Sequence, residues 1–160
     1  MPQITIEYII LLPILITQVF LFPMTASWLM NIWVDSRRTL ALKDVTSHLG
    51  STIQQLFFSL NHESISVGTV TYSTHLPPLI EENYYTGNAT LRSVTEPAGN
   101  SSKVLEVTMT LENTQTSASS QVIIGPNALW KESTFVSNST NACVKAEKFQ
   151  NGTICLYFGA

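Results

Sequence analysis

The stretch ITIEYIILLPILITQVFLFPMTASWLMNIWV, residues 4–34, decides the fold. Between Tyr8 and Val34 it contains no Asp, Glu, Lys or Arg, and Glu7 is its one charged residue. The run is longer than the roughly 20 residues that a helix needs to cross a bilayer, and longer than the about 7–15 apolar residues of a secretory signal. We therefore expect a long apolar helix, bent at Pro13 and Pro23, that ends up in lipid or in a packed helical core.

The helix is expected to continue beyond the apolar run. Residues 35–60 change to an amphipathic pattern in which apolar side chains recur every three or four positions, namely Leu42, Val45, Leu49, Ile53, Leu56 and Leu60. Neither Gly nor Pro occurs from Met24 to His48, so nothing separates the two patterns. We assign residues 1–62 to one helical segment and residues 63–160 to a second domain.

The second domain has the composition of an all-β fold. In VLEVTMTLENT, residues 104–114, Leu105, Val107, Met109 and Leu111 alternate with polar residues, as a half-solvated antiparallel strand requires. Turn residues separate this strand from further candidates at 65–73, 88–96, 120–125, 142–147 and 153–158. The expected fold class is α+β: one long N-terminal helix followed by an immunoglobulin-like antiparallel β-sandwich.

The composition argues against several classes of function. The net charge of −3 and the dispersed basic residues lack the electrostatic footprint of a nucleic-acid binder. Motifs of hydrolases, zinc proteases, P-loop proteins and dinucleotide-binding enzymes are missing from the sequence, and its three histidines lie in different contexts. We therefore expect a protein that is not an enzyme and that needs no cofactor or metal.

Two features favour an extracytoplasmic location for the second domain. Cys143 and Cys155 predict a disulfide at the last hairpin, where Asn151–Gly152 is the favoured dipeptide of a type I′ turn; two unpaired structural thiols are the alternative. N-glycosylation sequons begin at Asn88, Asn100, Asn138 and Asn151, whereas chance alone would give about two.

The charges after the apolar run favour a cytoplasmic location for the second domain. The basic residues there are Arg37, Arg38 and Lys43. They follow the apolar run, and the positive-inside rule alone would place the second domain in the cytoplasm. A basic leader that assists insertion and is later removed would reconcile the two indications, provided that the bilayer is not the final location of the helix.

The start of the chain resembles a known family. Gln3-Ile4-Thr5-Ile6-Glu7-Tyr8, followed by an apolar helix, is similar to the Q-x-[ST]-x-E-[FY] start of archaeal type IV pilins with a class III signal peptide. The resemblance implies that a prepilin peptidase cuts before Gln3 and that Glu7 becomes the acid at the fifth mature position. It also implies a membrane-inserted precursor, an assembly platform in the membrane, and a filament whose core consists of the helices.

Glu7 has two interpretations. An ionised carboxylate in an apolar bundle costs several kcal/mol unless it is paired, and the N-terminal amine of its own or a neighbouring subunit is the nearest available partner. Alternatively, Glu7 is an interfacial residue that the positive end of the helix dipole favours.

The sequence therefore predicts the major subunit of an extracellular filament that serves adhesion, with β domains that face solvent. The main rival is a single-pass, membrane-anchored glycoprotein whose ectodomain binds a partner. A membrane-bound enzyme or an accessory subunit of a larger complex is a further alternative.

Overall fold

The structure is a computed structural model that describes residues 3–95, 101–114 and 116–159, with no side chain described for residues 3–8, Thr95 and Ser101. It divides into two compact units, residues 1–37 and residues 38–160. Helix α1 (Gln3–Leu60) supplies the whole described part of the first unit and the first element of the second. The predicted long N-terminal helix is confirmed.

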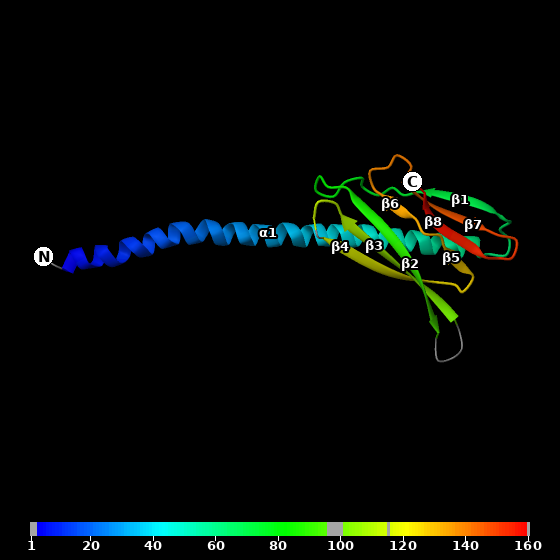
Figure 1. The fold of residues 1–160 in the computed structure, drawn as a ribbon, viewed down its shortest axis with the longest axis horizontal. Coiled ribbons are helices and arrows are strands. Elements are labelled where there is room, and N and C mark those ends of the chain that lie inside the picture. Colours follow the sequence, from blue (N-terminus) through cyan, green and yellow to red (C-terminus); the bar gives the residue numbers. More distant parts are fainter. Residues whose placement is uncertain (1–2, 96–100, 115, 160) are drawn as a thin grey trace. The chain divides into compact units, whose positions relative to one another are not determined.

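The described residues of the second unit form eight strands in two sheets (Figure 1). One sheet has the order β1-β7-β8-β5 and the other the order β4-β3-β2-β6. The strands are β1 (Gly68–Ser73), β2 (Tyr85–Thr95), β3 (Ser101–Leu111), β4 (Ser117–Ile124), β5 (Ala128–Trp130), β6 (Thr134–Val136), β7 (Cys143–Lys148) and β8 (Ile154–Gly159). All neighbours pair antiparallel except β5 and β8, which are parallel.

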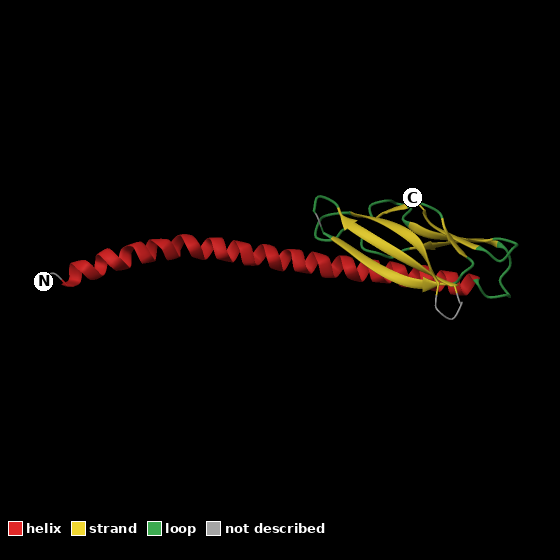
Figure 2. Cartoon of the chain, turned by 60° about the horizontal axis from the view of Figure 1, so that its bottom comes forward, coloured by secondary structure: helices red, strands yellow, loops and turns green. Residues whose placement is uncertain are grey.

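The hydrophobic core of the second unit includes the C-terminal part of α1, which lies along the strands (Figure 2). The helix contributes a stripe of side chains that are at most 7% exposed, namely Leu42, Val45, Leu49, Ile53, Phe57 and Leu60. On β3, Leu105, Val107, Met109 and Leu111 are fully buried, as their alternation predicted. The α+β class is therefore confirmed, with a largely antiparallel two-sheet domain after the helix.

Gly50 lies inside α1 without ending it. A Cβ atom at this position would lie 3.1 Å from Cγ1 of Val122 on β4, so the absence of a side chain allows the helix and the strand to approach closely. The nearby side chain of Gln54 donates a hydrogen bond to the carbonyl of Ile123 at 2.8 Å. The helix is thus fixed to the sheet by both packing and a polar contact.

Some boundaries differ from those expected. The second compact unit begins at Arg38, rather than at residue 63, because the helical stripe packs in the same core as the strands. Strands β5 and β6 were not predicted, since each spans only three residues and is too short to show an alternating pattern.

The turn between β7 and β8 is also different from the predicted type I′ turn. Gly152 has a φ of 78°, but Asn151 is not among the residues with positive φ, whereas type I′ needs positive φ at both central positions. The amide of Gly152 donates to the carbonyl of Phe149 at 3.0 Å, so Gln150 and Asn151 are the central residues of the turn. Gly152 follows them as the left-handed residue of a longer loop.

Candidate functional site

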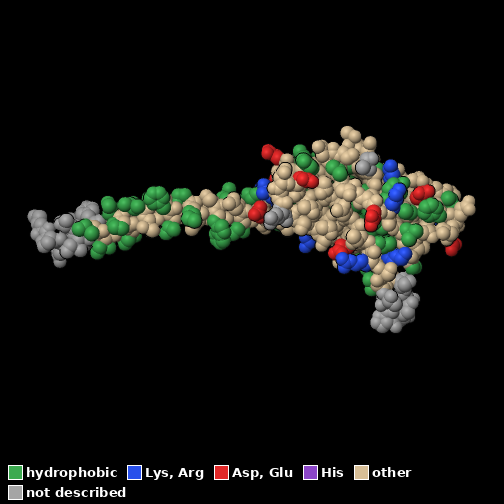
Figure 3. All heavy atoms as spheres, viewed as in Figure 1, with side chains coloured by type: hydrophobic (Ala, Val, Ile, Leu, Met, Phe, Trp, Pro, Cys, Tyr) green, Lys and Arg blue, Asp and Glu red, His purple; other side chains and the backbone are tan. Residues whose placement is uncertain are grey.

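The described side chains of the first unit form an apolar surface that surrounds the helix. Every large apolar side chain from Ile9 to Trp33 is between 47% and 76% exposed. Figure 3 shows these side chains along the helix on the face in view. A helix that is apolar on all sides is stable only where lipid or protein covers it. We call residues 9–33 the apolar segment.

The apolar segment is also suited to a membrane. Among the described residues, α1 is the one helix long and apolar enough to cross a bilayer, and its most apolar window has a mean hydropathy of 2.1 with no buried residues. At the end of the segment, the guanidinium carbon of Arg37 lies 4.9 Å from the ring centroid of Trp33. An aromatic ring beside a cation is typical of the boundary between an apolar layer and water.

The two prolines remain within the helix. Each lacks an amide hydrogen, so Pro13 and Pro23 leave the carbonyls of Ile9 and Val19 without their usual intrahelical donors. The hydroxyl of Thr17 donates to the carbonyl of Pro13 at 2.7 Å. Thr25 similarly donates to the carbonyls of Leu21 and Phe22, both at 3.0 Å. These two hydroxyls are therefore satisfied within their own helix.

Gln18 differs from these threonines. It lines a shallow hollow of about 780 Å³ beside Pro23, together with Leu15, Val19, Leu21, Phe22 and Thr25. No residue that the structure describes forms a hydrogen bond with its side-chain amide. The hollow is therefore lined by an unused amide donor and by Val19, the residue whose carbonyl lacks its intrahelical donor.

The predicted processing and assembly residues lie before the apolar segment. The backbone of Gln3 and Glu7 belongs to α1, but their side chains lie outside the described part of the chain. The pairing of Glu7 with an N-terminal amine therefore stays a prediction.

Three of the four predicted glycosylation sites are exposed. Asn88 lies on β2, Asn138 in the turn after β6, and Asn151 in the turn between β7 and β8. The side chain of Asn151 accepts a hydrogen bond from the amide of Thr153 at 3.0 Å. Asn100 lies outside the described residues. The exposure of these three asparagines is a requirement for glycan attachment, but modification itself stays a prediction.

The predicted disulfide between Cys143 and Cys155 is wrong: both cysteines are free thiols. In the pairing of β7 with β8, Cys143 lies opposite Gly159 and Cys155 lies opposite Glu147. The two cysteines are thus displaced by four positions along the hairpin, or about 13 Å, whereas a disulfide needs Cα atoms within about 7 Å. The structure therefore agrees with the alternative interpretation, in which the two thiols are unpaired.

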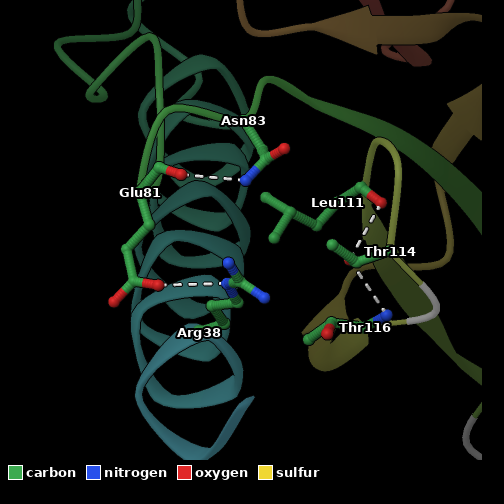
Figure 4. Close-up of polar contacts among 6 residues, drawn as sticks. All are labelled: Arg38, Glu81, Asn83, Leu111, Thr114 and Thr116. Atoms are coloured by element: carbon green, nitrogen blue, oxygen red, sulfur yellow. Dashed lines mark hydrogen bonds and ion pairs between the residues drawn. The ribbon is translucent and has the colours of Figure 1, made fainter. Parts of the chain in front are cut away.

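A strained turn in the second unit was not anticipated. Glu81 and Glu82 have φ values of 45° and 68°, in the left-handed region that side chains disfavour. The Nε atom of Arg38 donates to Oε2 of Glu81 at 3.0 Å (Figure 4). The sequence gives no signal for this turn, because glutamate is not typical of left-handed positions. One of the basic residues after the apolar segment is therefore bound to the β domain.

Comparison of the chain with protein-family models, with characterised proteins and with solved structures finds no significant match. Within the described residues, no group of three or more His, Cys, Asp or Glu side chains is arranged to hold a metal ion.

Proposed function

We propose that this protein is the major subunit of an archaeal type IV pilus-like extracellular filament, and that its apolar segment forms the filament core. The observation that carries the proposal is the exposure of every large apolar side chain between Ile9 and Trp33. The second unit already has a hydrophobic core of its own, which includes residues 42–60 of the helix. The apolar segment is not part of that core and needs another covering.

Copies of the same segment supply such a covering. Burying one large apolar side chain against water contributes about 1.5–3 kcal/mol, so the many side chains of the segment strongly favour a helical bundle over exposure. In the membrane, where lipid covers these side chains equally well, association depends on close packing and interhelical hydrogen bonds. Contacts that repeat head to tail without closing then generate a fibre.

Gln18 favours a neighbouring helix over lipid. Its amide lies in the middle of the apolar segment, where lipid offers no hydrogen-bond partner. Val19, whose carbonyl lacks an intrahelical donor because of Pro23, lines the same hollow. Because each copy presents both a donor and an acceptor, identical helices can satisfy one another.

The route to the filament follows from the family resemblance. A prepilin peptidase cuts before Gln3, the precursor waits in the membrane, and an assembly platform transfers it to the growing fibre. Glu7 then pairs with an N-terminal amine and adds to the axial register. The β domains remain in solvent, where exposed Asn88, Asn138 and Asn151 accept glycans and the surface serves adhesion.

The second candidate function is that of a single-pass, membrane-anchored surface glycoprotein with a binding ectodomain. The length and hydropathy of α1 favour it, as does the contact between Arg37 and Trp33 at the end of the apolar segment. Under this alternative, lipid alone covers the segment, and Gln18 has no assigned role.

Electron microscopy of material sheared from cells separates the two candidates. The filament proposal predicts fibres in which this chain is the main component. A chain that stays with the membranes after shearing, and that detergent extracts entirely as a monomer, would contradict the proposal and support the anchor.

A further inference from the structure

The second unit contains a polar hollow of about 590 Å³ that is far from the apolar segment in sequence. Strands β1 and β7 contribute Thr71, Ser73, Cys143 and Lys145, and the rest comes from the segments around residues 74–85 and 135–142. Val144 and Ala146 of β7 are fully buried in the core, so Cys143 and Lys145 belong to the opposite face of the sheet. The volume is typical of sites that bind small molecules.

The lining is rich in hydroxyl groups. Eight of its side chains carry a hydroxyl or an amide, namely Thr71, Ser73, Thr74, Tyr85, Ser137, Ser139, Thr140 and Asn141. Lys145 is the one cation among the lining residues, and none of them carries a carboxylate. Leu76 and Pro78 add apolar surface. Such a lining fits a ligand that carries several hydroxyl groups and one negative charge.

Hydrogen bonds hold the two sides of the hollow together. The hydroxyl of Thr74 donates to the carbonyl of Ala142 at 3.2 Å, which ties the segment after β1 to the segment before β7. The amide of Tyr85 donates to the buried hydroxyl oxygen of Ser137 at 2.9 Å. The phenol of Tyr85 donates in turn to the carbonyl of Pro77 at 2.6 Å. These hydrogen bonds of the fold therefore hold the walls of the hollow in place.

Lys145 stands apart from the other basic residues. Six of the eight have a partner on the chain, through an ion pair, a backbone carbonyl or an aromatic ring, namely Arg37, Arg38, Arg92, Lys103, Lys131 and Lys148. Lys43 is exposed to water. Lys145 is half-buried, and no described residue forms an ion pair or a hydrogen bond with its ammonium group.

The position of Lys145 depends on a glycine across the strand pair. A Cβ atom on Gly159 would lie 2.8 Å from Cε of Lys145 and closer still to Sγ of Cys143. The missing side chain therefore leaves the space in which the lysine stem and the sulfur lie. A partly buried cation without a counter-ion is costly, and a bound anion offsets that cost.

We propose that this hollow binds an acidic saccharide: the carboxylate of one sugar ring pairs with Lys145, while the ring hydroxyls bond to the serine, threonine and asparagine side chains. Neighbouring apolar surface receives the carbon face of the ring. The proposal names a ligand class for the adhesive role but does not require a filament, because every lining residue belongs to the second unit.

Ligand-observed NMR on the full chain in detergent micelles tests the proposal, with D-glucuronate, D-glucose and inorganic phosphate as probes. Glucuronate is expected to bind at least tenfold more tightly than either other probe. Lys145→Gln is expected to weaken glucuronate binding at least tenfold, whereas Lys43→Gln, which removes the exposed lysine, leaves this affinity unchanged.

Two outcomes would overturn the proposal. Equal binding of glucose and glucuronate would remove the role of Lys145, and equal binding of phosphate and glucuronate would remove the role of the hydroxyl groups. Thr71→Val, which leaves the lysine in place, is expected to weaken glucuronate binding by several fold. This variant tests the proposal if Lys145→Gln does not fold. Fibre formation is unaffected by these variants, so the result is separate from the test of the filament.

Discussion

The guanidinium of Arg38 and the carboxylate of Glu81 lie 3.0 Å apart, although 43 positions separate them in the sequence. Glu81 and Glu82 form the centre of a tight turn in which Ile80 and Asn83 exchange backbone hydrogen bonds of 2.9 and 3.0 Å. Both glutamates have a left-handed backbone conformation. The turn therefore holds Glu81 opposite Arg38 at the expense of backbone strain.

This strain can be measured with a matched pair of glycine variants. Glu82→Gly removes the side chain that disfavours positive φ and is expected to raise the free energy of unfolding by about 0.5–1 kcal/mol. Glu81→Gly relieves the same strain but loses the ion pair with Arg38, so its gain is expected to be smaller. Chemical denaturation followed by circular dichroism gives both values. Destabilisation by Glu82→Gly would contradict this account.

The unpaired thiols predict a simple chemical result. When the chain is unfolded without a reducing agent, iodoacetamide is expected to add to both Cys143 and Cys155, because no disulfide protects them. Intact mass spectrometry counts the two adducts. If the chain accepted adducts only after reduction, the two cysteines would be paired in a disulfide after all.

The reactivity of Cys155 should depend on its charged neighbours. Burial raises the pKa of its thiol, Glu147 raises this pKa further, and Lys131 lowers it. Glu147→Gln should therefore lower the pKa, increase the thiolate fraction at pH 8 and speed alkylation of the folded chain. Lys131→Gln should slow alkylation. The rates are measured in a Cys143→Ala background, and equal rates in the two variants would exclude the electrostatic effect.

Tyr85 makes stability sensitive to high pH. Burial raises the pKa of its phenol to about 12, above the roughly 10 of an unfolded chain. Its contribution to stability is therefore complete below about pH 10 and is lost as the pH rises towards 12. Tyr85→Phe should flatten this part of the pH profile and cost about 1 kcal/mol at neutral pH, because the hydrogen bond to Pro77 is lost. Denaturation midpoints between pH 8 and pH 12 provide the measurement, with Tyr84→Phe, at a 40% exposed position, as the control.

The hollow at Pro23 offers a test of contacts inside the proposed fibre. Gln18→Leu removes the unused amide and is expected to weaken each subunit contact by about 0.6–2 kcal/mol, so that fibres dissociate at a lower temperature. Thr25→Val changes the same hollow but removes a hydroxyl already bonded within its own helix. Thermal dissociation in detergent, followed by light scattering, compares the two. Gln18→Leu fibres as resistant as Thr25→Val fibres would contradict an interhelical role for Gln18.

The sequence alone determined the features that depend on local periodicity. An uncharged run from Tyr8 to Val34 specifies an apolar helix, and the spacing from Leu42 to Leu60 specifies the buried stripe that follows it. In that stripe Phe57 is fully buried, whereas the predicted Leu56 is only partly buried. Leu105 to Leu111 specifies the inner face of β3 in the same way. These patterns are readable because one element contains the whole repeat.

Only the tertiary structure decided which distant residues meet. Strand register separates Cys143 from Cys155, a close contact between the helix and β4 depends on the missing side chain of Gly50, and segments far apart in sequence form the polar hollow around Lys145. The left-handed turn at Glu81 is likewise held by its surroundings and not by residue preference. The physical reason is that strand order and register depend on packing across the whole domain, which no local pattern records.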